Sequence, residues 1–166
     1  MQGWPAFLML IAAGRHGDGN GVHACTQIGC WSGAELELGA FPESDVPRLT
    51  GARVEVCINS TCGDAVIAML PPPNDVKTVR LSQPIDPRIE VLLSRTDPSG
   101  LIEIEINVVS ELPEWFEDGD VYTVTLEDTG GARIAKRAWS VTCRTFTPNG
   151  SRCEPTCRQA SGKNEL

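Results

Sequence analysis

The chain has 166 residues, of which 41% are hydrophobic, and a formal net charge of -8. The length suits a single domain with its own core, and the hydrophobic fraction is too high for a disordered chain. Residues 1–131 contain 20 acidic and 7 basic residues, whereas residues 132–166 contain 2 acidic and 7 basic ones. An acidic body argues against a nucleic-acid partner, because phosphate binding requires a basic surface.

Residues 1–14 have the pattern of a signal segment. Residues 6–13 form an apolar run that ends in small residues. The run is shorter than the roughly 20 residues of a membrane-spanning helix, and it fits the apolar region of a signal peptide. No Lys or Arg precedes it, so a buried segment at a sheet edge stays an alternative. We expect an exported protein, periplasmic, extracellular or at the cell surface, with a flexible glycine-rich linker over residues 15–30.

Val22-His23-Ala24-Cys25 resembles the lipoprotein box of bacterial exported proteins. The resemblance makes Cys25 a lipidation candidate, and a lipid there is the only membrane attachment that we expect. The alternative is that Cys25 forms a disulfide or remains a free thiol.

Alternating apolar and polar residues predict short β-strands between residues 31 and 145. The clearest run is 101–109, in which four apolar side chains would face the core. Residues 89–95 fit both a strand and a short helix, since Asp86 and Pro87 can open a helix. Six to eight such strands with polar turns predict an antiparallel sandwich. The other runs are 35–38, 53–58, 62–70, 121–127 and 133–143.

The segment Asp118-Gly119-Asp120-Val121-Tyr122 resembles the tyrosine corner of immunoglobulin-like domains. The resemblance implies an all-β, antiparallel, immunoglobulin-like sandwich, in which the hydroxyl of Tyr122 bonds back to the loop. Two features depart from antibody domains. Val124 stands where their second core cysteine lies, and no core tryptophan is evident in a middle strand. The similarity is therefore to the broad immunoglobulin or fibronectin-like architecture.

Two cysteine patterns are similar to those of small, uncharacterised exported bacterial proteins. They are Cys25-Thr-Gln-Ile-Gly-Cys30 and Pro148-Asn-Gly-Ser-Arg-Cys153-Glu-Pro-Thr-Cys157. This resemblance covers most of the chain and implies an exported protein or lipoprotein without a known activity. Residues 146–166 are expected to form a cysteine-containing C-terminal tail. The basic segment 132–166 is expected to lie on the acidic body as its last strand and tail, and binding of an acidic partner is the alternative.

Cys57 and Cys62 can face each other across a hairpin, because four residues separate them. That geometry predicts a disulfide. Zinc is the competing interpretation, but the cysteine spacings lack the usual Cys-x-x-Cys.

Two further disulfides are expected from the remaining cysteines. Cys153 and Cys157 can close a small loop, and Cys30 and Cys143 can join the ends of the domain. A bridge that closes so long a loop contributes about 4–5 kcal/mol in the chain-entropy model. Cys25 is then the odd cysteine.

No nucleophile lies beside a base in a known catalytic motif, so we do not expect an enzyme or a cofactor. The glutamate pairs Glu35/Glu37 and Glu103/Glu105 are expected on the solvent faces of their strands. The leading hypothesis is a non-catalytic exported module that has a structural role or binds a protein or glycan.

The alternative function is a calcium-dependent or carbohydrate-binding module that uses residues 114–120. Oxygen-rich loops can bind Ca²⁺, which takes six to eight oxygen ligands. Trp115 and Phe116 are candidates for contact with a partner or sugar, or for covering the end of the core. The candidate metal ligands around them are Glu114, Glu117, Asp118 and Asp120.

Overall fold

In a computed structural model, the described residues are 29–82, 87–96, 100–110, 112–150 and 155–165. The expected signal segment, Cys25 and Cys153 lie outside them. Nearly all of the regular structure in these ranges is β-strand. The strands are β1 (Ser32–Phe41), β2 (Arg53–Ile58), β3 (Thr61–Val66), β4 (Val76–Arg80), β5 (Arg88–Thr96), β6 (Leu101–Ser110), β7 (Val121–Glu127), β8 (Arg133–Phe146) and β9 (Cys157–Glu165). The short helices are η1 (Glu43–Asp45), α1 (Val46–Leu49) and η2 (Pro113–Trp115).

The strands form one continuous sheet in the order β3-β2-β7-β8-β9-β1-β6-β5-β4. Neighbouring strands are antiparallel, except that β9 runs parallel to β1. The two edges of the sheet meet at a single bridge between Asp64 and Ser82. There the backbone oxygen of Asp64 accepts bonds from the backbone N–H and the hydroxyl of Ser82, at 3.2 and 3.0 Å. The sheet therefore nearly closes on itself.

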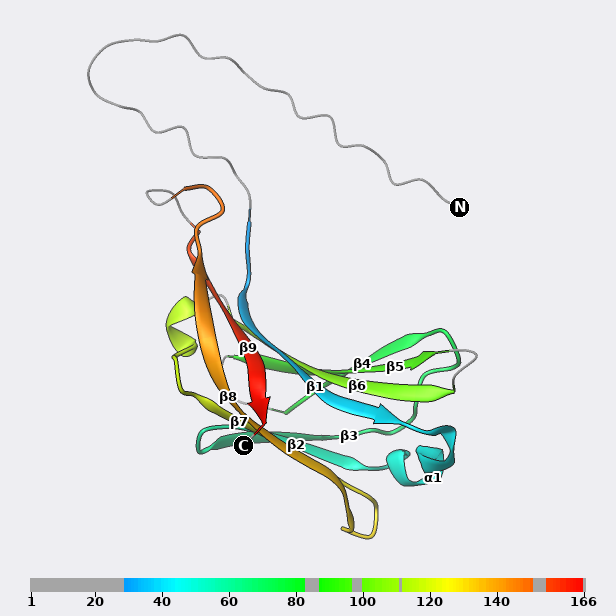
Figure 1. The fold of residues 1–166 in the computed structure, drawn as a ribbon. Helices are drawn as coiled ribbons and strands as arrows, with labels where there is room; N and C mark the ends of the chain where they lie inside the picture. The colour runs from blue at the N-terminus through cyan, green and yellow to red at the C-terminus, as the bar shows by residue number, and fades with distance from the viewer. Residues whose placement is uncertain (1–28, 83–86, 97–99, 111, 151–154, 166) are drawn as a thin grey trace, which may run out of the picture.

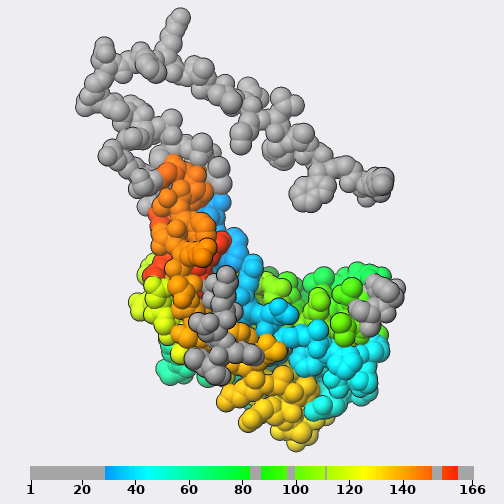
Figure 2. Space-filling model, in the orientation of Figure 1, coloured from blue at the N-terminus to red at the C-terminus, as the bar shows by residue number. Residues whose placement is uncertain are grey.

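The core lies between two facing parts of this sheet. In Figure 1, β1, β4, β5 and β6 lie above β2, β3 and β7. Every second residue of the central strands is buried, as the alternation predicts, because side chains alternate between the two faces of a strand. Figure 2 shows that the end of β8 and the starts of β9 and β1 project above this body. The inner residues include Leu36, Val54, Val56, Ile102, Ile104, Ile106, Val124 and Leu126, all at most 1% exposed.

The ambiguous segment 89–95 is a strand. Ile89, Val91 and Leu93 are buried, and β5 pairs with β6 on one side and β4 on the other. These pairings and the period of two decide against a helix. The segment 62–70 leaves the sheet earlier than expected, because β3 ends at Val66 before a proline-rich connection.

The predicted antiparallel sandwich of six to eight strands is not the observed architecture. The described sheet has nine strands, and β9 joins the two layers by pairing with β8 and β1. The segment 146–166, expected as a tail, thus supplies a strand inside the sheet. The expected absence of a core tryptophan is also wrong, since Trp139 of β8 is 4% exposed and lies opposite Tyr122 of β7.

The junction of β9 with β1 is fixed at the start of both strands. Cys30, just before β1, is bonded to Cys157, the first residue of β9, with the two Cα atoms 6.0 Å apart. The backbone N–H of Arg158 donates to the hydroxyl of Ser32 at 3.1 Å. Two strands that are tied together at their first residues run in the same direction. The bridge is therefore consistent with the parallel pairing.

We predict that removing this bridge with Cys30→Ala and Cys157→Ala lowers the free energy of unfolding by about 4–5 kcal/mol, because it closes a long loop. For a domain of this size the melting midpoint would fall by roughly 10–20 °C. Thermal and urea unfolding measure the change. Cys143→Ser, which keeps both disulfides, is the control and should shift stability by less than about 1 kcal/mol. A similarly small loss in the double variant would contradict this role.

Candidate functional site

Two disulfides lie within the described residues. Cys57 and Cys62 form the predicted hairpin bridge, as opposed residues of β2 and β3 with Cα atoms 4.0 Å apart. The other predicted pairs are wrong, because Cys157 is bonded to Cys30 rather than Cys153, and Cys143 is a free thiol. The sequence did not reveal that residue 157 begins a strand beside β1. Disulfides are typical of proteins from an oxidising compartment.

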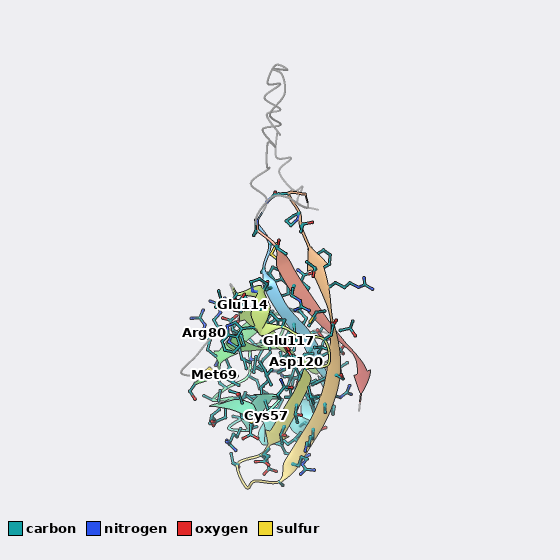
Figure 3. The ribbon with its side chains drawn as sticks, turned by 90° about the vertical axis from the view of Figure 1, so that its left-hand side faces the viewer. Cys57, Met69, Arg80, Glu114, Glu117 and Asp120 are labelled. Atoms are coloured by element: carbon teal, nitrogen blue, oxygen red, sulfur yellow. A yellow bond between two sulfur atoms is a disulfide. The ribbon has the colours of Figure 1, made fainter. Side chains whose placement is uncertain are left out.

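The acidic segment 114–120 is tied to the fold by its own carboxylates. Asp120 accepts bonds from the backbone N–H of Glu117 and from the side-chain amide of Asn59, both at 2.9 Å. Glu117 and Asp120 lie close together in Figure 3. The side-chain oxygen of Asn59 in turn accepts a hydrogen bond from the backbone N–H of Val121 at 2.9 Å. Asp120 therefore links the β2–β3 turn to the start of β7.

Asp118 has a similar structural role. Its carboxylate accepts a bond from the backbone N–H of Cys143 at 2.6 Å, while Gly119 and Asp120 exchange backbone bonds with Val141 at 3.0 Å. These contacts attach the segment to β8. No three His, Cys, Asp or Glu side chains in the described part of the chain are grouped closely enough to hold a metal ion. The predicted calcium ligands are thus not assembled into a cation site.

The two aromatic residues of this segment separate. Phe116 is fully buried and belongs to the core, whereas Trp115 in η2 is 42% exposed. Only Trp115 is therefore placed to contact a partner. The pair is split because η2 ends at Trp115 and the chain then turns toward the interior.

Tyr122 does not complete a tyrosine corner. Its side chain is fully buried, and its hydroxyl has no hydrogen-bond partner. Burial raises the pKa of Tyr122 well above its ordinary range, and the neighbouring Asp120 and Cys143 raise it further. The predicted bond from this hydroxyl to the loop is absent, and Asn59 and Asp120 hold the loop instead.

The free thiol of Cys143 is not activated as a nucleophile. The residue is half-buried on the inner face of β8 and packs against the core. Burial raises the pKa of this thiol, Arg158 lowers it, and the carboxylates of Asp118 and Asp120 raise it. A raised pKa disfavours the reactive thiolate.

An acidic depression lies on the outer face of β1, β6 and β5. Its volume is about 540 Å³. Glu37 lies directly opposite Glu105 in the β1–β6 register, and Glu103 lies opposite Ser94, whose hydroxyl donates to it at 3.2 Å. We call this surface the acidic face. It is lined by Glu35, Leu36, Glu37, Val76, Leu92, Ser94, Glu103, Ile104 and Glu105.

The glutamates of the acidic face form no ion pair with the side chains of residues 29–82, 87–96, 100–110, 112–150 and 155–160. By contrast, Glu90, further along β5, pairs with Arg80 and Arg88 at 3.1 and 3.2 Å. Like charges directly opposite each other on paired strands are destabilising. Sequence reasoning placed the four glutamates in solvent but could not show that β1 pairs with β6.

We predict that Tyr122→Phe raises the free energy of unfolding by about 1 kcal/mol, because it removes a buried hydroxyl without a partner. The difference should grow above about pH 10, where the tyrosine ionises in the unfolded chain but not in the folded one. Urea unfolding at pH 7 and pH 10.5 measures both effects. A loss of about 1 kcal/mol at pH 7 would instead show that the hydroxyl is bonded.

We predict that Asp120→Ala lowers the free energy of unfolding by about 1–2 kcal/mol, because Asn59 and Glu117 lose their shared acceptor. Glu114→Ala in the exposed η2 helix is the matched control and should change stability by less than about 0.5 kcal/mol. Thermal melts of the two variants give the comparison. Equal effects would show that the Asp120 bonds do not support the fold.

Comparisons with protein-family models, with curated proteins and with solved structures give no significant match to this chain. Within the described ranges, no helix is long and apolar enough to cross a membrane.

Proposed function

We propose that this protein is a non-catalytic exported module and that its acidic face binds a cationic polypeptide. The observation that carries the proposal is the set of four glutamates around one depression, none of which forms an ion pair with a side chain that the structure describes. Two of them, Glu37 and Glu105, are held opposite each other by the register of β1 and β6. An arrangement that costs stability in the free protein is explained if a positive partner relieves it.

The shape of the acidic face favours Lys or Arg side chains. A depression lined by one sign of charge concentrates the field and attracts the opposite charge. Leu92 and Val76 provide apolar surface beside the carboxylates. The aliphatic stems of Lys and Arg can pack on such surface while their charged ends reach the glutamates. The strands fix the backbone positions of the glutamates, so little backbone freedom is lost on binding.

Export is supported by the two disulfides, which are characteristic of oxidising compartments. The signal-like segment 1–14 and lipid attachment at Cys25 are further parts of this proposal. The two facing layers support a distant likeness to immunoglobulin-like sandwiches, with β9 added between the layers. Neither this likeness nor the proposed relation to small exported bacterial proteins implies an activity.

A carbohydrate site at Trp115 is the second candidate, because an exposed indole offers an apolar surface to a sugar ring. A calcium site in the same segment is less well supported. Asp118 and Asp120 already accept hydrogen bonds from the chain, whereas Ca²⁺ requires six to eight oxygen ligands.

We predict that a short fluorescein-labelled polylysine peptide binds the full chain. The double variant Glu37→Gln, Glu105→Gln should bind it about ten-fold more weakly, because charge attraction is lost. Fluorescence anisotropy at low ionic strength gives the affinity, and about 0.5 M NaCl should abolish binding. The free energy of unfolding of the same variant should be up to about 1 kcal/mol higher than that of the unaltered protein, because the opposed charges are gone.

The matched control is Glu114→Gln with Glu117→Gln, which makes the same change in net charge away from the acidic face. It should alter the affinity by less than about two-fold, since only distant charges change. Equal weakening by both double variants would show that the peptide responds to the overall charge of -8 and would overturn the proposed site.

A further inference from the structure

The two described disulfides have different surroundings. Cys157 is 3% exposed, and its bond to Cys30 joins residues 127 positions apart. Cys62, in contrast, is exposed on the edge strand β3, and its partner Cys57 is half-buried only five positions away. Cys30, the partner of Cys157, is half-buried. Of these four bonded cysteines only Cys62 is exposed, so it is the one that a thiolate from outside reaches most readily.

The hairpin that contains Cys57 and Cys62 is also held by contacts other than their bond. β2 and β3 are paired in register from Arg53 and Val66 to the turn, and β2 is also paired with β7. At the turn, the backbone N–H of Asn59 donates to Val121 at 2.7 Å, and its side chain bonds to Val121 and Asp120. Asn59 adopts a positive φ of 54°, which asparagine tolerates.

These contacts would hold the two sulfurs in position after the bond is opened. Cys57 and Cys62 are directly opposed in the strand register. Their thiols would therefore remain neighbours, and oxidation would close the same bond again. By contrast, Cys30 and Cys157 fix the junction on which the continuity of the sheet depends.

We propose that Cys57–Cys62 is a site of reversible thiol–disulfide exchange with an external dithiol, while Cys30–Cys157 is a structural bond that takes no part. One thiolate of the dithiol attacks Sγ of Cys62, and the S–S bond breaks to release Cys57 as a thiolate. The second thiol of the dithiol then displaces Cys62. The dithiol is oxidised to a disulfide, and the two cysteines gain two electrons and two protons.

Graded dithiothreitol treatment of the full chain under native conditions tests the proposal. Thiols are alkylated at intervals, peptide mapping by mass spectrometry identifies each cysteine, and circular dichroism follows the β-sheet. The Cys57–Cys62 bond should open at least about ten-fold faster than the Cys30–Cys157 bond, because Cys62 is exposed. The β-sheet signal should stay unchanged, and replacing the reductant with oxidised dithiothreitol, which accepts the two electrons, should restore the bond.

Equal rates, faster opening of Cys30–Cys157, or opening only when the β-sheet signal is lost would each overturn the proposal. The single variants Cys57→Ser and Cys62→Ser test the point of attack. The thiol left at Cys62 should react with an aromatic disulfide reagent several-fold faster than the thiol left at Cys57. The reverse order would show that Cys62 is not the attacked residue, and peptide mapping separates both thiols from Cys143.

Discussion

The parallel pairing of β9 with β1 is the contact on which the continuity of the sheet depends. It links the group β3-β2-β7-β8 to the group β1-β6-β5-β4, whose backbones are otherwise bridged in the described sheet at Asp64–Ser82. On its other side β1 lies close to β6, since a Cβ atom on Gly33 would lie 2.2 Å from the carbonyl oxygen of Val108. Glycine is therefore required where β1 passes between β9 and β6.

The same arrangement creates the acidic face. β1 has β9 on one side and β6 on the other, so Glu35 and Glu37 come to lie beside Glu103 and Glu105. A bulge in β1 between Glu37 and Gly39 shifts the register, and Gly39 takes a φ of +139°. As a result Phe41 packs against the core, while both glutamates stay on the outer face. Burial on one side of the sheet thus fixes the charge pattern on the other.

Polar groups near the start of β7 show how local patterns mislead. The acidic loop looks like a cation site, yet Asp118 and Asp120 serve as acceptors for backbone and amide donors. Tyr122 looks like a tyrosine corner, yet its hydroxyl is buried without a partner. The residue that replaces the corner is Asn59, which reaches the loop from the β2–β3 turn, 62 positions before Val121. Its only sequence signal was its place in a hairpin turn, where asparagine is common.

The sequence by itself determined the all-β class, most of the strands and the Cys57–Cys62 bridge. Those features depend on short-range physics: the alternation of a run such as 101–109 follows from the two faces of a strand, and residues 57 and 62 meet across a two-residue turn. Only the tertiary structure decided the rest. The alternating side chains of β4 are at most half-buried, and β9 contains no β-branched or aromatic residue, so their neighbours impose the strand conformation. The Cys30–Cys157 bond and the acidic face likewise depend on which strands pair. Periodicity in the sequence reports only which face of its strand a residue occupies, so it does not identify the partner strand.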